Sequence, residues 1–146
     1  MSKLISRKIF GSDNFLIFYT AFSTDLVYPT PPEQIDPESM GWGPDSDIRT
    51  FKDPKWFSAA SSWLKVTPFG FRKLLNWVSE EYQKPIIVTE NGFSDYLGNL
   101  DDIPRIYYYK HFINQMLKAV KIDGVDVRGY FAWSLMDNFE WAMGYS

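Results

Sequence analysis

The 146-residue sequence contains no cysteine, which excludes disulfide bonds, thiolate chemistry and cysteine-based zinc sites. It has a single histidine, His111, which lies off the apolar face of an expected helix and is interpreted as a surface or hydrogen-bonding residue. No apolar run approaches the roughly 18–20 residues that span a bilayer. The formal net charge is only −3 and Lys and Arg are scattered. The sequence therefore predicts neither nucleic-acid binding nor a membrane association.

The amino-terminal end has basic residues ahead of an apolar patch, but Ser12-Asp13-Asn14 interrupts that patch. A secretory signal peptide needs a continuous apolar region at this place. We therefore expect a cytoplasmic location, and secretion stays open if the amino terminus is truncated. Nothing in the sequence indicates an oligomeric state.

Aromatic residues make up 18% of the chain, which is a high share. Surplus aromatic surface serves either in a core or as flat faces that stack on ligands. Residues 28–60 form a second unusual feature, because six of the nine prolines lie between positions 28 and 56. We expect a long proline-rich loop there, within a single compact domain.

Apolar runs at 15–22, 86–89 and 129–135 are typical of buried strands, and amphipathic segments beginning near residues 67 and 102 predict two helices. The first predicted helix has an apolar face of Phe71, Leu74, Leu75, Val78 and Tyr82. The second has a face of Ile106, Tyr109, Ile113, Met116, Leu117 and Val120. Strands alternating with helices indicate βαβ units and a parallel sheet.

Chemistry in parallel sheets gathers at the carboxyl ends of the strands. Glu90 stands at one such end, followed by the turn-forming pair Asn91-Gly92, and Glu140 follows the last strand. Trp133 and Trp141 flank the same region. An indole stacks on the C–H face of a sugar ring while carboxylates bind its hydroxyls, so this grouping suggests sugar recognition.

Several separated stretches resemble glycoside hydrolase family 1, the family of β-glucosidases, lactase-phlorizin hydrolase and myrosinase. They are "PIIVTENGFSD", "DGVDVRGYFAWSLMDNFEWAMGYS" and "SSWLKVTPFGFRKLLNWV". The resemblance runs from about residue 11 to the end and implies an α/β fold, a TIM (β/α)8 barrel. The three strands then resemble the sixth, seventh and eighth of that barrel, so residues 1–146 are expected to form an incomplete, carboxyl-terminal part of the catalytic domain.

The resemblance also implies an activity and a set of site residues. It implies retaining hydrolysis of a β-glucoside or related small glycoside, with no metal or organic cofactor. Glu90 matches the family's nucleophile, and Tyr19 is similar in placement to a tyrosine that hydrogen-bonds it. The expected sugar-binding residues are Trp133 as the floor of the sugar site, Glu140 and Trp141 at its outer hydroxyls, and Trp63 on the aglycone side.

The family's second catalytic acid belongs to an Asn-Glu-Pro motif, and that motif does not occur in these 146 residues. A retaining glycosidase needs two carboxyl groups, so the chain alone is expected to be inactive. The alternative is a non-catalytic, klotho-like relative or truncated product that binds sugars or a protein.

Each site residue also has a structural interpretation. Glu90 could pair with a helix terminus, Trp133 could pack in the core, and Glu140 with Trp141 could be a solvated acid beside a loop anchor. Trp63 could pack against the helix that follows it.

Overall fold

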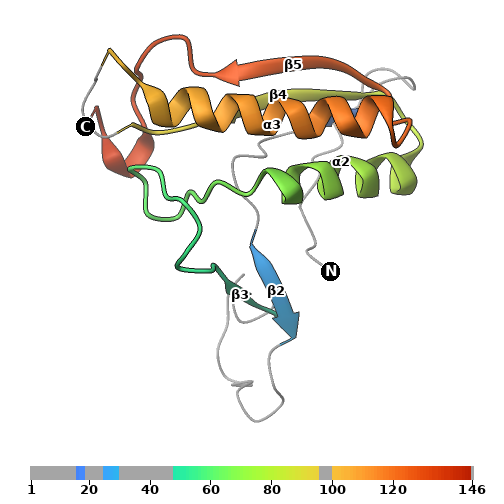
Figure 1. Ribbon diagram of the computed structural model, residues 1–146, viewed down its shortest axis with the longest axis horizontal. Helices are drawn as coiled ribbons and strands as arrows, with labels where there is room; N and C mark the ends of the chain where they lie inside the picture. The colour runs from blue at the N-terminus through green and yellow to red at the C-terminus, as the bar shows by residue number, and fades with distance from the viewer. Residues whose placement is uncertain (1–15, 19–24, 30–47, 96–99, 146) are drawn as a thin grey trace.

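The computed structural model describes residues 16–18, 25–29, 48–95 and 100–145 (Figure 1). The chain order of the described elements is β1 (Leu16–Phe18), β2 (Leu26–Pro29), β3 (Ile48–Phe51), α2 (Pro68–Tyr82), β4 (Ile86–Gly92), α3 (Ile103–Lys121), β5 (Val127–Trp133) and the short 3-10 helix η2 (Trp141–Met143).

Strands β1, β4 and β5 form a parallel sheet in that order, with Ile87 opposite both Ile17 and Gly129. The predicted βαβ arrangement is therefore confirmed for the described residues. The strand expected at 86–89 is longer than predicted and continues to Gly92. Asn91, interpreted as a turn residue, is instead fully buried within β4. Of the strand expected at 15–22, residues 19–22 lie outside the described part.

Helix α2 begins where the sequence predicted, with Thr67 before it and Pro68 in its first turn. Its buried residues are Gly70, Phe71, Leu74, Leu75 and Val78. Leu75 and Val78 are fully buried in the hydrophobic core, which stabilises the fold by about 1.5–3 kcal/mol for each side chain. The predicted apolar face of this helix is confirmed.

The predicted apolar face of α3 is only partly right, because Tyr109 and Met116 pack against the core but the fully buried positions are different ones. The buried side chains of this helix are Tyr108, Phe112 and Ala119, whereas Ile106 and Leu117 are exposed. The ring of Phe112 stacks on Tyr108 with centroids 4.0 Å apart and also meets Phe71 of α2 at 5.5 Å. Apolar residues occupy several sides of α3, so periodicity alone did not identify the side that packs on α2 and β4.

The proline-rich segment expected as a loop at 28–60 contains strand β3, which pairs antiparallel with β2. This two-stranded ribbon projects away from the sheet and helices (Figure 1). Residues 30–47, between the two strands, lie outside the described part. Within the described ranges, neither α2 nor α3 is long and apolar enough to cross a membrane.

Candidate active site

Glu90 lies on a β-bulge near the carboxyl end of β4. Val88 pairs with Tyr130 and Asn91 with Ala132, so β4 has two residues where β5 has one. A bulge bends its strand and redirects a side chain, and bulges are common beside active sites. Glu90 is half-buried rather than fully solvated. The sequence predicted an acid at a strand end, but not the bulge that carries it.

Two effects raise the pKa of the Glu90 carboxyl above its usual range. Burial of the carboxylate is the larger cause, and the negative charge of Glu140 is the second. Two carboxylates that repel each other must lie near one another, although about 50 residues separate them in the sequence. The structure therefore brings together two of the predicted site residues, Glu90 and Glu140.

Trp133, the last residue of β5, is held at both its side chain and its backbone. Its indole Nε1–H donates a hydrogen bond to Glu140 Oε1 at 3.2 Å, and its backbone oxygen accepts one from the Tyr109 hydroxyl at 2.9 Å. The side chain is 39% exposed, so it is not an ordinary core tryptophan. Trp133 therefore joins Glu90 and Glu140 in one cluster.

Gly92 allows β4 and β5 to approach closely beside this cluster. It pairs with Trp133, and a Cβ atom added at position 92 would lie 1.8 Å from the Trp133 backbone oxygen. Any side chain at this position would push the two strands apart. The position of the Trp133 backbone thus requires a glycine at position 92, two residues after Glu90.

Glu140 and Trp141 lie where the chain enters η2. The Glu140 backbone N–H donates to the Gly144 backbone oxygen at 2.7 Å, and the Glu140 backbone oxygen accepts from the Met143 N–H at 2.9 Å. Trp141 has a positive φ of 50° and an 81% exposed side chain. Trp141 therefore has its indole open to solvent, directly after Glu140.

Trp63 lies on a hairpin-like turn closed by the bridge between Ser58 and Lys65. The turn is attached to the segment that follows β4, because Ala60 N–H donates to the Ser94 backbone oxygen and Ser61 N–H donates to Ser94 Oγ, each at 3.0 Å. The Trp63 side chain is 53% exposed. Tyr19, the other predicted catalytic residue, lies outside the described residues.

Sequence reasoning missed a buried hydrogen-bond network next to Glu90. Asn91 Nδ2 donates to the Tyr108 hydroxyl at 2.8 Å, and the Tyr130 hydroxyl donates to Asn91 Oδ1 at 2.7 Å. Burial raises the pKa of both tyrosines well above the usual range, so both hydroxyls stay neutral. The signal available in the sequence was Asn91, an amide side chain directly after Glu90 at the end of a buried strand.

The run Tyr107-Tyr108-Tyr109 spans several faces of α3. Tyr107 is exposed, Tyr108 is buried and Tyr109 reaches the end of β5. The helix start predicted near residue 102 is confirmed, since α3 begins at residue 103. Asp102 makes no capping hydrogen bond, and its carboxylate instead contacts Arg105.

Residues 6–146 match the model of glycosyl hydrolase family 1. Human lactase/phlorizin hydrolase is 46% identical over 145 residues, which is 96% of this chain and 7% of the relative. The chain thus spans only a small part of the curated relatives that it matches.

A solved rice β-glucosidase has a TM-score of 0.77 and 36% identity, and the match covers 86% of this chain and 29% of that one. A mutant of the rice enzyme in a covalent complex with Glc has a TM-score of 0.65 and 42% identity over 70% of this chain and 24% of that one. These neighbours are TIM barrels. The described residues of this chain form a small parallel sheet with its helices. The chain belongs to glycosyl hydrolase family 1.

Proposed function

We propose that this chain carries the nucleophile of a retaining β-glycosidase acting on β-glucosides, and that Glu90 is that nucleophile. One observation carries the proposal. Glu90 is half-buried on a bulge and close enough to Glu140 for its pKa to be raised, and Glu140 accepts a hydrogen bond from the Trp133 indole. An attacking carboxylate, a second carboxylate and an indole thus meet at the carboxyl ends of two parallel strands.

In the proposed first step, a Glu90 carboxylate oxygen bonds to the anomeric carbon as the bond from that carbon to the aglycone oxygen breaks. A general acid donates a proton to the departing oxygen. In the second step, water attacks the anomeric carbon, the bond to Glu90 breaks, and the same acid, now a base, takes the proton from water. The covalent complex of the rice relative with Glc supports a chemistry of this kind.

The sugar-binding roles follow from side-chain chemistry. Trp133 provides a flat apolar face for the ring, and its hydrogen bond to Glu140 fixes the indole and the carboxylate relative to each other. Glu140 accepts hydrogen bonds from the outer hydroxyls, and these charge-assisted bonds are stronger than neutral ones. Trp141 is an exposed second contact, and Trp63 is a platform on the aglycone side.

We further propose that the three parallel strands correspond to the sixth, seventh and eighth strands of the family's barrel. Their order in the sheet, β1-β4-β5, follows their order along the chain, which fits such a position. The general acid of the mechanism above would be a residue other than these 146, because the sequence has no Asn-Glu-Pro motif. The 146-residue chain alone should therefore have little or no turnover.

The missing motif also favours a second candidate, a non-catalytic relative that binds sugars or a protein partner. Such a protein would use Trp133 and Glu140 as a binding surface and would have no need of a reactive acid at position 90. The two candidates differ in one testable property, which is the reactivity of the Glu90 carboxylate toward an anomeric carbon.

The test is covalent labelling with 2-deoxy-2-fluoro-β-glucosyl fluoride. Fluoride departs with little help from an acid, and the fluorine at C2 slows hydrolysis of the glycosyl–enzyme, so the missing acid does not prevent labelling. We expect mass spectrometry of the digested chain to find one fluoroglucosyl group, on the peptide that contains Glu90.

Glu90→Gln should abolish the label, and Glu81→Gln, a matched change of an exposed glutamate on α2, should leave it intact. An unlabelled wild-type chain that still binds glucose would refute the nucleophile role and favour the second candidate. Turnover of an aryl β-glucoside by the chain alone, abolished by Glu90→Gln, would refute the proposed inactivity.

A further inference from the structure

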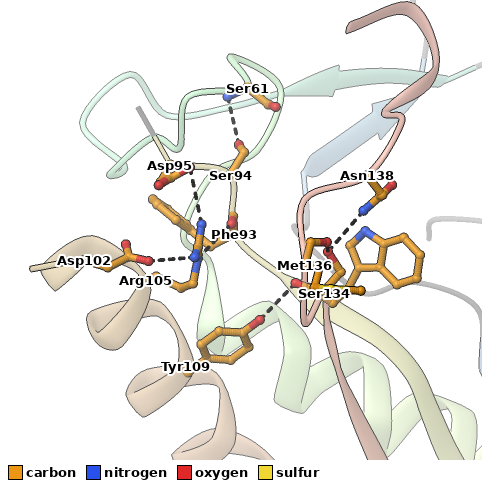
Figure 2. Close-up of polar contacts among 11 residues, drawn as sticks. Ser61, Phe93, Ser94, Asp95, Asp102, Arg105, Tyr109, Ser134, Met136 and Asn138 are labelled. Carbon is orange, nitrogen blue, oxygen red and sulfur yellow. Dashed lines mark hydrogen bonds and ion pairs between the residues drawn. The ribbon is translucent and has the colours of Figure 1, made fainter. Parts of the chain in front are cut away.

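The first turn of α3 contacts the segment that follows β4 through Arg105. Its Nε donates to the Phe93 backbone oxygen at 3.4 Å, and its guanidinium forms an ion pair with Asp95 at 3.4 Å. A third contact, 2.7 Å to Asp102 three residues earlier, orients the guanidinium. Figure 2 shows Arg105 between Asp102 and this segment. Arg105 therefore binds both neighbours of Ser94, Phe93 through its backbone oxygen and Asp95 through its carboxylate.

Ser94 in turn attaches the turn carrying Trp63, which the bridge between Ser58 and Lys65 closes, to the segment that follows β4. Its backbone oxygen and its hydroxyl accept hydrogen bonds from the N–H groups of Ala60 and Ser61, each at 3.0 Å. Ser61 is two residues from Trp63, and the indole itself is 53% exposed. Because half of this indole is exposed, the hydrogen bonds that hold its turn contribute to its position.

The next turn of α3 contacts the other side of the site. Tyr109 is four residues after Arg105 and therefore lies on the same face of the helix. Its hydroxyl donates to the Trp133 backbone oxygen at 2.9 Å, and Figure 2 shows the ring directed toward the chain at Ser134. The Trp133 indole is also partly exposed, so a backbone contact has a large share in fixing it.

We propose that Arg105 and Tyr109 are positioning residues that set the distance between the two tryptophan faces of the sugar site. Arg105 places Trp63 through Ser94, and Tyr109 places Trp133 directly. Because both side chains extend from adjacent turns of one helix, the spacing of the two indoles is fixed by α3 rather than by the two loops. The description of these indoles as sugar-binding faces rests on the proposed function.

Tryptophan side-chain signals in a two-dimensional ¹H–¹⁵N spectrum of the 146-residue chain test this proposal. Trp63 and Trp133 are assigned by Trp→Phe replacement, and Trp77 on α2 serves as an internal reference. Arg105→Gln should shift the Trp63 signal and leave that of Trp133 in place. Tyr109→Phe should do the reverse. The conservative variant Arg105→Lys should restore part of the Trp63 shift, because it keeps the charge opposite Asp95.

Two controls separate positioning from a general loss of structure. Arg128→Gln removes another arginine ion pair, the one with Asp126, and Tyr107→Phe changes the exposed tyrosine next to the buried one. Neither should shift either signal. Ser94→Ala removes only the hydroxyl that Ser61 contacts, and it should shift the Trp63 signal even if Arg105→Gln fails to fold.

Equal shifts of every indole signal, Trp77 included, in both variants would show a purely structural role and overturn the proposal. So would unshifted Trp63 signals in both Arg105→Gln and Ser94→Ala. The functional consequence is measured by titration with two glucosides. Arg105→Gln should weaken binding of phenyl β-glucoside about fivefold and leave methyl β-glucoside unchanged, whereas Tyr109→Phe should weaken both.

Failure of the proposed function and failure of this inference give different results. A chain that neither binds a glucoside nor accepts the fluoroglucosyl label on Glu90 would refute the function. The indole signals would still report whether Arg105 and Tyr109 hold the two tryptophans independently. Selective shifts would then support the positioning roles, and unselective shifts would overturn them.

Discussion

Replacing Gly92 with alanine perturbs the closest contact in the candidate site. The added Cβ atom would lie 1.8 Å from the Trp133 backbone oxygen, more than an ångström inside the shortest contacts that real Cβ atoms make. The obstacle is a backbone atom, so no change of rotamer can relieve it. The carboxyl ends of β4 and β5 must separate, and the hydrogen bond from Tyr109 to the same oxygen must lengthen or break.

The expected loss in the free energy of unfolding follows from these two effects. Overpacking that forces a backbone shift costs about 1–3 kcal/mol. Loss of a hydrogen bond to the Trp133 oxygen adds about 1 kcal/mol. We therefore expect Gly92→Ala to destabilise the chain by about 3 kcal/mol, a large share of the 5–15 kcal/mol that is typical of a domain.

Urea denaturation followed by tryptophan fluorescence measures this loss against two matched glycine variants. A Cβ at Gly129 would lie 3.2 Å from the Ile87 side chain, which can move, and one at Gly124 would meet nothing within 4 Å, although φ there is +76°. Each should cost about 1 kcal/mol, from crowding and from strain respectively. If Gly92→Ala costs no more than these two variants, the close approach of Gly92 to the Trp133 backbone is refuted.

Two further predictions concern the neighbours of Gly92. Glu140→Gln should lower the pKa of Glu90, measured by ¹³C NMR titration, but not to the usual value, because burial is the larger cause of the shift. Because the pKa of Glu90 is raised in the folded chain, stability is lost as the pH rises from the unfolded to the folded pKa of this carboxyl. Glu140→Gln narrows the gap between these two pKa values, so the variant should lose less stability across it. An unchanged pKa of Glu90 would contradict the electrostatic contact with Glu140. Asn91→Ala should cost about 2–4 kcal/mol in urea denaturation, because the hydroxyls of Tyr108 and Tyr130 lose a buried hydrogen-bond partner. A cost below about 1 kcal/mol would show that this network does not stabilise β4.

Local patterns predicted the elements of the fold well where one pattern dominated. The amphipathic segment beginning near residue 67 indicated the start of α2, and the spacing of Phe71, Leu75 and Val78 identified its buried side. The same method was only partly right for α3, because Ile106 and Tyr108 are both large and only the packing against α2 and β4 decides which is buried. Burial on α3 is a property of the tertiary contacts and not of the local sequence.

The site shows a similar division. The residue types and strand ends pointed to Glu90, Trp133 and Glu140, and the structure brings these three together. The bulge under Glu90 and the contact of Tyr109 with the Trp133 backbone were not predictable, because each depends on the register between two separate elements, β4 and β5 for the bulge and α3 and β5 for the contact. Sequence spacing within one segment carries no information on such a register.

The central claim is that one sugar ring contacts Glu90, Trp133 and Glu140 at the same time. A crystal structure of the chain after reaction with 2-deoxy-2-fluoro-β-glucosyl fluoride measures this directly. We predict a bond from the anomeric carbon to a Glu90 carboxylate oxygen, with the ring against the Trp133 indole and outer hydroxyls on Glu140. A sugar attached to another residue, or a ring that contacts neither Trp133 nor Glu140, would contradict the account.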